Sequence, residues 1–351
     1  MRRRLRELGY AVGRFPTGEL NALTDVPGVL VGHRTLIEGE RLRTGVTAIL
    51  PHDGNLYAQK VLGGCHVVNG YGKAAGITQL AELGTVESPI LLTSTLSVGP
   101  VWEGGLRHLL EQNPQAARDR DTVNVIVGEC FDGWLSDARA LGVRPEHALD
   151  AIAAAAGEER REGSIGAGTG TTCFGFKAGV GQSSRLVEGF ALGCLVVTNY
   201  GSRRDLHLLV GPVQPPPGDE PPAQQGGSIM IVLGTDAPLD ERQLRRLGAR
   251  GAFGLGRAGS FASNSSGEYV LAFSTAHRIP HRDDSGRLEL SLLRDDSLAL
   301  RQLFEAAGEL VHEAVLGSLC AAEAMEGRDG HRAEAFPYEL LANAPNVREG
   351  V

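Results

Sequence analysis

Short runs of aliphatic and β-branched residues, each bounded by glycine or proline, recur along this sequence. Many of them are continuously apolar rather than alternating, which is typical of strands that are buried on both faces. A sheet of such strands needs a covering layer on each side. We therefore predict an α/β fold with strands at Val29–Val31, Ile90–Thr93, Val123–Val127, Phe190–Val197, Leu208–Val210, Ile229–Leu233 and Val270–Phe273.

Helical patterns lie between these predicted strands. Pro145–Ala156 carries a proline near its first turn and continues as an alanine-rich stretch, and Leu298–Met325 is an amphipathic segment that predicts one long helix or two shorter ones. The 351 residues suffice for two ordinary domains or one large α/β domain, so length leaves the domain number open. The 48 glycines predict many tight turns and close backbone approaches.

The charge and the apolar pattern exclude several functional classes. A formal net charge of −8 argues against a nucleic-acid partner, because such proteins need a basic surface to neutralise phosphates. No stretch approaches the roughly 18 apolar residues of a membrane span, so no membrane partner is predicted. The basic residues 2–6 are followed by Glu7 and by no long apolar run. We interpret them as a surface segment rather than a signal peptide and expect a cytoplasmic protein.

Three motifs that could indicate a metal or a cofactor lack the necessary context. The five cysteines are scattered, odd in number and without CxxC spacing, so we expect mostly core thiols. The residues GLGRAG at 254–259 form a GxGxxG pattern, but they follow the helix-like segment Glu241–Arg250 rather than a strand. The Gly/Thr-rich loop at 166–172 has no following Gly-Lys-Ser/Thr, so we interpret it as close backbone packing. We predict neither a metal nor an organic cofactor.

One segment interrupts the alternation of strands and helices. Residues 214–227 read QPPPGDEPPAQQGG, a composition that excludes a regular helix or a central strand and predicts a loop. The buried-strand pattern SIMIVL follows at once and begins at Ser228. From composition alone, a flexible connection between two elements explains this arrangement well.

A serine that follows a glycine at such a junction can also undergo an internal acyl shift. Its hydroxyl reaches the preceding carbonyl only in an unusual backbone conformation, which Gly227 would permit at little steric cost. Hydrolysis of the resulting ester leaves Ser228 with a free α-amino group. The reference pKa of that group is about 7.7–8.0, so it can serve as a base for its own hydroxyl. A neighbouring side chain could take the proton instead.

Several motifs, in order along nearly the whole chain, resemble the self-processing L-aminopeptidase/D-esterase and β-aminopeptidase family. They are PTGELNALTDVPGVLVGH, TGVTAILPH, VVNGYGK, LTSTLSVG, VGECFDGWLSD, GSIGAGTGTTCFGFKAG, VVTNYG, GGSIMIVLGTDAPL and LRRLGARGAFGLGRAGSFASNSSGEYVLAFSTAH. The resemblance implies a four-layer αββα sandwich in the style of N-terminal nucleophile hydrolases. It also implies one domain over residues 1–351 that cuts itself into an α chain, 1–227, and a β chain, 228–351.

The same resemblance implies roles for individual residues. Ser228 would be the nucleophile for both maturation and turnover, after cleavage between Gly227 and Ser228. Ser266 would hydrogen-bond with Ser228 Oγ and transfer its proton, and Glu268 would orient that serine or the α-amine. Asn199 would direct its side-chain amide at the carbonyl oxygen and stabilise the oxyanion.

Substrate binding is expected at two further positions. Glu129 resembles the carboxylate that meets the substrate's ammonium group. Phe131 and Trp134 fall where some relatives have a pocket tyrosine, and neither can donate a phenolic hydrogen bond, so we assign Trp134 to substrate binding only. Lys73 is expected to be an exposed cation, or else a pocket or subunit contact.

These expectations combine into one functional hypothesis with two rivals. The first is a serine aminopeptidase that removes an L-, D- or β-aminoacyl residue from short peptides, amides or esters, and the resemblance implies a homotetramer of αβ units. The second is acyl transfer by a related self-cleaving fold, against which the serine at the cut counts, because those relatives typically use threonine. The third is a non-catalytic binding protein in which residues 214–227 are only a linker.

Overall fold

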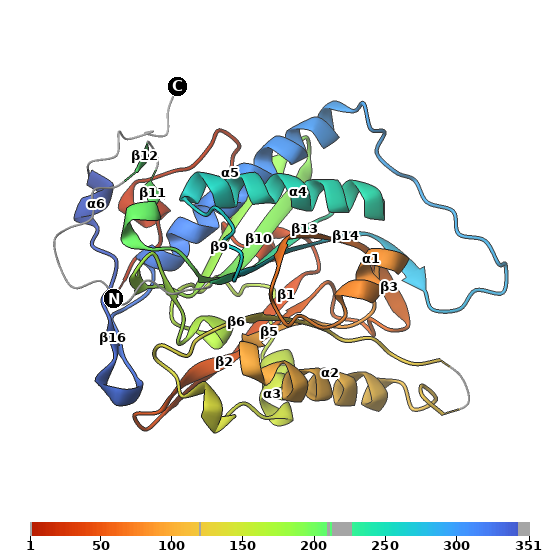
Figure 1. Ribbon diagram of the computed structural model, residues 1–351. Coiled ribbons are helices and arrows are strands. Elements are labelled where there is room, and N and C mark those ends of the chain that lie inside the picture. The colour runs from red at the N-terminus through yellow and green to blue at the C-terminus, as the bar shows by residue number, and fades with distance from the viewer. Residues whose placement is uncertain (1, 119–120, 209–210, 213–226, 343–351) are drawn as a thin grey trace.

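In the computed structural model, which describes residues 2–118, 121–208, 211–212 and 227–342, two β-sheets are stacked between two layers of helices (Figure 1). Helices α4 and α5 cover the outer face of the larger sheet, and α2 and α3 cover the outer face of the smaller one. The order of layers is thus α, β, β, α, as the resemblance implied. Each sheet is covered on both faces, which explains why its central strands are apolar throughout.

The larger sheet has six strands and contains the strand that begins at Ser228. All neighbours are antiparallel except β13 and β14, which run in parallel. In spatial order the strands are β4 (Thr85–Val86), β3 (Gln59–Gly70), β14 (Gly267–Pro280), β13 (Ser228–Thr235), β10 (Phe190–Asn199) and β9 (Val180–Val187).

The smaller sheet has four strands, and three two-stranded pairs of the described chain lie outside both sheets. The four are β1 (Leu30–Glu38), β2 (Leu42–Leu50), β5 (Ile90–Ser94) and β6 (Ile126–Cys130), with β5 and β6 in parallel. The pairs are β7 (Thr172–Cys173) with β8 (Phe176–Lys177), β11 (His207–Leu208) with β12 (Gly211–Pro212), and β15 (Met325–Glu326) with β16 (Arg332–Ala333).

The helices begin and end where the local sequence provides caps. At the start of α4, the Asp240 side chain accepts a hydrogen bond from the Gln243 backbone amide, and the Gln243 side chain accepts one from the Asp240 backbone amide. Gly259 ends the helix with a left-handed φ of 114°. Ser297 caps α5 by accepting from the Leu300 amide. The helices are α1 (Ile77–Leu83), α2 (Val98–Gln112), α3 (Pro145–Ala153), α4 (Glu241–Ala258), α5 (Leu298–Cys320) and α6 (Glu339–Ala342).

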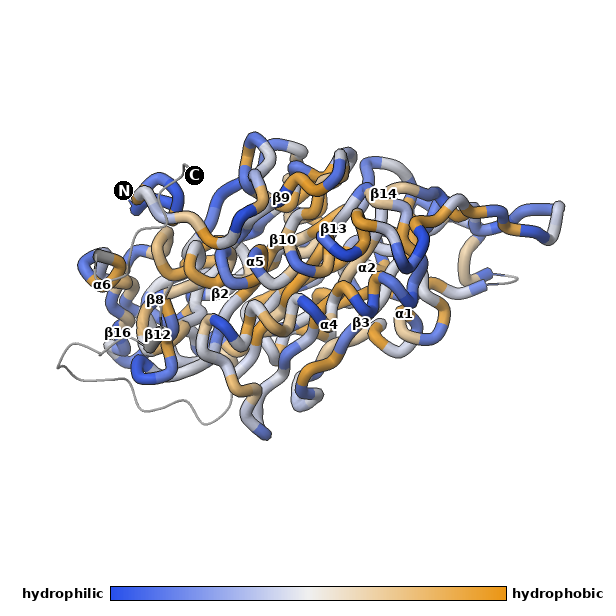
Figure 2. The backbone as a smooth tube through the Cα atoms, turned by 90° about the horizontal axis from the view of Figure 1, so that it is seen from above, coloured by the Kyte–Doolittle hydropathy of each residue, from blue (hydrophilic) through white to orange (hydrophobic). Residues whose placement is uncertain are grey.

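Three apolar cores separate the four layers. The first lies between the larger sheet and α4 and α5, the second between the two sheets, and the third between the smaller sheet and α2 and α3. Hydrophobic residues concentrate along β10, β13 and α5, and hydrophilic ones along the peripheral loops (Figure 2). All eight residues of β13 are buried, so the strand that begins with Ser228 is rigidly packed on both faces.

Most strands predicted from apolar runs are present, with shifted ends. The run Val123–Val127 becomes a strand only from Ile126, and part of Leu208–Val210 lies outside the described residues, as does the predicted loop at 214–226. Leu298–Met325 is a single helix that ends at Cys320. The GxGxxG residues lie in and after α4, where a Cβ on Gly254 would come within 2.3 Å of the Gly308 carbonyl of α5. Gly254 therefore serves helix packing, and Gly259 ends the helix.

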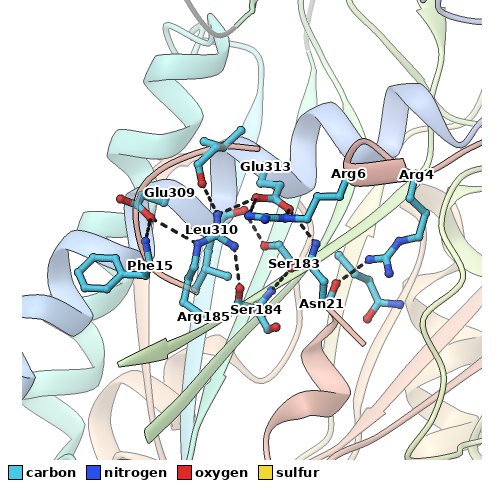
Figure 3. Close-up of polar contacts among 12 residues, drawn as sticks. Arg4, Arg6, Phe15, Asn21, Ser183, Ser184, Arg185, Glu309, Leu310 and Glu313 are labelled. Carbon is cyan, nitrogen blue, oxygen red and sulfur yellow. Dashed lines mark hydrogen bonds and ion pairs between the residues drawn. The ribbon is translucent and has the colours of Figure 1, made fainter. Parts of the chain in front are cut away.

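Strand β9 (Val180–Val187) was not predicted from the sequence, because four of its buried residues in a row, 182–185, are polar. Arg185 is fully buried and pairs with Glu309 and Glu313 of α5, at 3.4 and 2.7 Å (Figure 3). The N-terminal segment contacts these charges as well, because Arg6 forms a bidentate ion pair with Glu313. Paired charges and hydrogen bonds make burial of these residues tolerable, although a hydropathy pattern does not reveal it.

Three global features concern the described part of the chain. None of its helices combines the length and the apolar character that crossing a membrane requires. All five cysteines are buried and free, as expected of core thiols. No group of three or more His, Cys, Asp or Glu residues within it could hold a metal ion.

Candidate active site

Ser228 lies where three strands of the larger sheet meet at one edge. It is the first residue of β13, opposite Asn199, the last residue of the antiparallel β10. On its other side it is in register with Gly267, the first residue of the parallel β14. Because β10 ends where β13 and β14 begin, residues distant in the sequence converge on one serine. Ser228 itself is 4% exposed.

The Gly227 carbonyl, which belongs to the predicted scissile bond, is held by this same edge. Its oxygen accepts a hydrogen bond of 2.9 Å from the Gly267 amide. A Cβ on Gly227 would lie 2.8 Å from Tyr200 Cβ and 3.1 Å from the Asn199 carbonyl oxygen. We expected glycine here for an unusual backbone conformation, but its φ is outside the left-handed region. The close approach of neighbouring residues is what requires glycine.

The hydroxyl of Ser228 faces the second sheet. Its Oγ accepts a hydrogen bond of 3.2 Å from the amide of Phe131, the residue after β6. Cys130 lies beside it, but burial raises the pKa of that thiol, and its Sγ donates to the Val197 carbonyl. The thiol stays protonated, so Ser228 is the available nucleophile at this point.

A cavity of about 260 Å³ opens over Ser228 and has a charged end and an apolar rim. Ser228, Asn199 and Glu129 line its polar part, and Tyr71, Leu96 and Phe131 line its apolar part. The Glu129 carboxylate is 4% exposed and already accepts from the Lys73 amide at 3.0 Å and from the Thr95 hydroxyl. These two donors fix the carboxylate in the cavity wall, where it can meet a cation.

Asn199 is oriented by Thr172, which ends the Gly/Thr-rich segment and begins β7. Its Oδ1 accepts a hydrogen bond of 3.2 Å from the Thr172 amide. With its oxygen engaged, the side chain has Nδ2 left to donate into the cavity that it lines. This is the polarity that an oxyanion-stabilising amide requires.

Ser266 and Glu268 lie on the other side of Gly227. The Ser266 hydroxyl contacts both Glu268 Oε1 and, at 2.8 Å, the Ser263 carbonyl. Both residues line a second cavity of about 320 Å³, which shares Gly227 and Ser265 with the first. Among the described residues neither makes a hydrogen bond to Ser228 Oγ, the contact that we expected for Ser266. Glu268 Oε2 is buried and has no partner within the described chain.

Trp134 lies away from both cavities, whereas Lys73 lies at the mouth of the first. Trp134 stacks on His331, with ring centroids 4.0 Å apart, and is not among the residues that line either cavity. The neighbouring Phe131 lines the first cavity instead. Lys73 is exposed, as expected, and its ammonium lies 4.2 Å from the centre of the Tyr71 ring.

Comparison with known proteins places the chain in a family. Residues 21–333 match peptidase family S58. The chain belongs to peptidase family S58. A β-peptidyl aminopeptidase, BapA of Sphingosinicella microcystinivorans, is 36% identical over 96% of this chain and 90% of its own length. This relative therefore aligns with nearly the whole S58 chain.

Two solved structures extend the S58 comparison to the fold. The PH0078 protein of Pyrococcus horikoshii OT3 is 44% identical, with a TM-score of 0.90 over 97% of this chain and 98% of that one. An L-aminopeptidase D-Ala-esterase/amidase of Ochrobactrum anthropi, described as a variant of the Ntn hydrolase fold, is 34% identical, with a TM-score of 0.87 over 96% of each chain. These comparisons confirm three predictions, namely the family, an α/β fold that resembles the Ntn hydrolases, and a serine peptidase with an N-terminal nucleophile.

Three backbone amides that contact the candidate site were not predicted from the sequence. The amides of Phe131, Gly267 and Thr172 contact Ser228, Gly227 and Asn199 respectively. A backbone amide carries no signature in its side chain, so no pattern identifies it. Thr95 was within a recognised motif, LTSTLSVG, but only its contact with Glu129 shows why it matters.

Proposed function

We propose that this S58 chain is a self-processing serine aminopeptidase. It cuts its own Gly227–Ser228 bond and then removes the N-terminal residue from short peptides, amides or esters. The observation that carries the proposal is the position of Ser228, with its hydroxyl below a cavity that also contains Glu129 and Asn199. Because relatives include a β-peptidyl aminopeptidase and an L-aminopeptidase D-Ala-esterase/amidase, the acyl residue is proposed to be an L-, D- or β-aminoacyl group.

In the maturation step, Ser228 Oγ attacks the Gly227 carbonyl carbon. The amide of Gly267 donates to the carbonyl oxygen and stabilises the negative charge that develops there. The C–N bond then breaks, the hydroxyl proton goes to the departing nitrogen, and an ester joins Gly227 to Ser228 Oγ. Water hydrolyses the ester, which leaves a carboxylate on Gly227 and a free hydroxyl and α-amine on Ser228.

In turnover, Glu129 binds the substrate's ammonium group and presents its first carbonyl to Ser228. Ser228 Oγ attacks, Asn199 Nδ2 donates to the oxyanion, and the leaving amine takes the proton. Water then resolves the acyl-enzyme. The Ser228 α-amine, with a reference pKa of about 7.7–8.0, is one candidate base. The Ser266–Glu268 pair is the other, since it borders the space around Gly227.

Buried ion pairs support the proposal that the two chains stay together after cleavage. Arg6 and Arg185 come from residues 1–227, whereas Glu309 and Glu313 come from residues 228–351. The apolar core between the larger sheet and α4 and α5 also combines residues of both chains, so dissociation would break these ion pairs and expose that apolar surface to water. The homotetramer of αβ units and the cytoplasmic location stay predictions.

Mass spectrometry and an activity panel test this proposal. The purified protein should consist of fragments 1–227 and 228–351 and should release amine from at least one of the L-, D- and β-aminoacyl p-nitroanilides. An uncut chain without activity would favour the binding-protein hypothesis. Release that requires an added amine acceptor, with no free acid formed in its absence, would favour the acyltransferase.

Replacement of Glu129 by glutamine should weaken the binding of substrates with a free ammonium group. Loss of a charge-assisted hydrogen bond costs about 1.5–3 kcal/mol, so kcat/KM should fall roughly 10- to 100-fold. Self-cleavage should persist, because the Gly227 acyl group has no free ammonium. Steady-state kinetics on an aminoacyl p-nitroanilide measures the effect. Glu87→Gln, which changes another buried carboxylate outside the cavity, is the matched control. An unchanged kcat/KM would remove Glu129 from the mechanism.

Glu268 should make the stability of the chain depend on pH. Burial raises the pKa of Glu268 above 4.5, and the hydrogen bond from Ser266 opposes this shift. The folded chain therefore holds the proton more tightly than the unfolded one. The resulting stabilisation is fully present below pH 4.5 and is lost as the pH rises through the folded pKa.

Denaturant unfolding measures this dependence in two proteins, Ser228→Ala and the double variant that also carries Glu268→Gln. The Ser228→Ala background is used because it should remain one chain. Between about pH 4 and pH 8, the free energy of unfolding of the protein that retains Glu268 should fall relative to that of the Glu268→Gln protein. A constant difference between the two proteins over that range would contradict the pKa shift.

A further inference from the structure

Lys177 is a fully buried lysine that the proposed mechanism does not use. It ends the short strand β8, and its Nζ donates to the carbonyl oxygens of Gly168 at 3.2 Å, Thr171 at 2.9 Å and Ala178. Three carbonyl acceptors match the three N–H groups of an ammonium. These acceptors are all backbone oxygens rather than carboxylates, and burial of a cation in such surroundings is costly, so its retention here calls for a specific reason.

One of these contacts leads directly to the active site. The Thr171 carbonyl and the Thr172 amide belong to the same peptide group. The carbonyl accepts from Lys177, and the amide donates to Asn199 Oδ1 at 3.2 Å. Because a trans peptide is planar, its C=O and N–H point in opposite directions, so fixing one end fixes the other. A cation at the oxygen also polarises the group and strengthens its N–H as a donor.

The surrounding loop has little freedom to compensate for the loss of Lys177. A Cβ on Gly168 would come within 2.4 Å of the Val180 amide of β9. The Phe174 amide donates to the carbonyl of Tyr200, the residue after Asn199. The loop at 168–174 therefore packs against β9 on one side and contacts the residue after β10 on the other. The Thr171 carbonyl accepts from the Ala178 amide at 3.4 Å and from the Lys177 ammonium at 2.9 Å, so Lys177 makes the shorter of its two contacts.

We propose that Lys177 is a positioning residue for the oxyanion-stabilising amide. It holds the Thr171–Thr172 peptide so that Thr172 N–H engages Asn199 Oδ1, and this directs Asn199 Nδ2 at the carbonyl oxygen of the substrate. The inference rests on the proposed function, since it assigns the support of a group whose own role is proposed above. Burial lowers the pKa of Lys177 to about 7, and the Asp132 carboxylate opposes this shift. Amine and ammonium both donate to Thr171, whereas only the ammonium can serve all three carbonyls.

A double-mutant cycle with Lys177→Met and Asn199→Ala tests the inference. Methionine has a similar length and no donor. In the wild-type background, Lys177→Met should lower kcat on an aminoacyl p-nitroanilide on the order of 10- to 100-fold with KM nearly unchanged, because Glu129 is untouched. In the Asn199→Ala background the same change should lower kcat less than about threefold, since the group that Lys177 positions is already absent.

Two controls separate positioning from general support of the fold. Arg185→Met removes another fully buried cation, remote from the cavity, and should lower the melting temperature without a selective loss of kcat. Lys177→Gln keeps a donor on a shorter side chain and should restore part of the kcat lost in Lys177→Met. It also serves for the cycle if the methionine variant does not fold.

The possible failures are distinguishable. Equal losses of kcat from the Lys177 change in both backgrounds would overturn the inference and leave the proposed function intact. An Asn199→Ala protein with wild-type kcat would instead contradict the proposed role of Asn199. Unchanged kcat in folded Lys177→Met would also overturn the inference.

Discussion

Replacing Ser228 by alanine should give a protein that stays in one piece and does not turn over substrate. The change removes the hydroxyl that accepts from the Phe131 amide, so neither the acyl shift nor the acyl-enzyme can form. Removal of a nucleophile of this kind costs at least about 10⁴-fold in kcat. A denaturing gel and mass spectrometry should show a single chain of 37.1 kDa in place of two fragments.

The matched control is Ser274→Ala. Ser274 is also a buried serine of the larger sheet, but it lies midway along β14, opposite Thr235 at the far end of β13, and donates to the Ala237 carbonyl. That variant should be cut and active. Cleavage of Ser228→Ala at the same bond, or retention of wild-type turnover by it, would refute the mechanism.

The second large effect should come from Asn199→Ala. Its Nδ2 is a side-chain donor that lines the cavity over Ser228, and loss of one oxyanion donor costs about 10²- to 10³-fold in kcat, or about 3–4 kcal/mol. KM should change little, because the proposed partner of the ammonium is Glu129 rather than Asn199. Steady-state kinetics on a single aminoacyl p-nitroanilide separates the two parameters.

An isosteric variant sharpens this prediction. Asn199→Asp keeps the shape and can still accept from Thr172, but it places an anion where negative charge develops. It should therefore be at least as inactive as Asn199→Ala. If Asn199→Asp retained more activity than Asn199→Ala, the side chain would act by shape or as an acceptor rather than as an oxyanion donor.

The sequence carried much of the fold and pointed to the proposed nucleophile. Continuous apolar runs predicted β10 and β13 because these strands are buried on both faces, and a polar Pro/Gly-rich segment before an apolar strand marked Ser228. It failed at β9, where Arg185 and its polar neighbours are buried through ion pairs that come from α5. Local hydropathy reports burial only when burial is apolar.

The positions of individual side chains in the site were harder to predict from the sequence. Trp134 and Phe131 lie three residues apart, yet only Phe131 reaches the cavity, since Trp134 stacks on His331 from a distant segment. Ser266 and Glu268 lie two residues apart and do contact one another, but their common cavity lies across Gly227 from Glu129. Side-chain direction depends on which partners are near, and these come from elsewhere in the chain.

The residue types and their order were enough to predict the α/β class, the family, and the serine that begins a buried strand. Only the tertiary structure shows which groups lie around that serine. They are the amides of Phe131, Gly267 and Thr172, and the buried Lys177 that contacts the Thr171 carbonyl. The physical reason is that hydropathy and propensity act over a few neighbouring residues. A hydrogen bond between backbone groups far apart in sequence exists only once two sheets and their loops have closed around it.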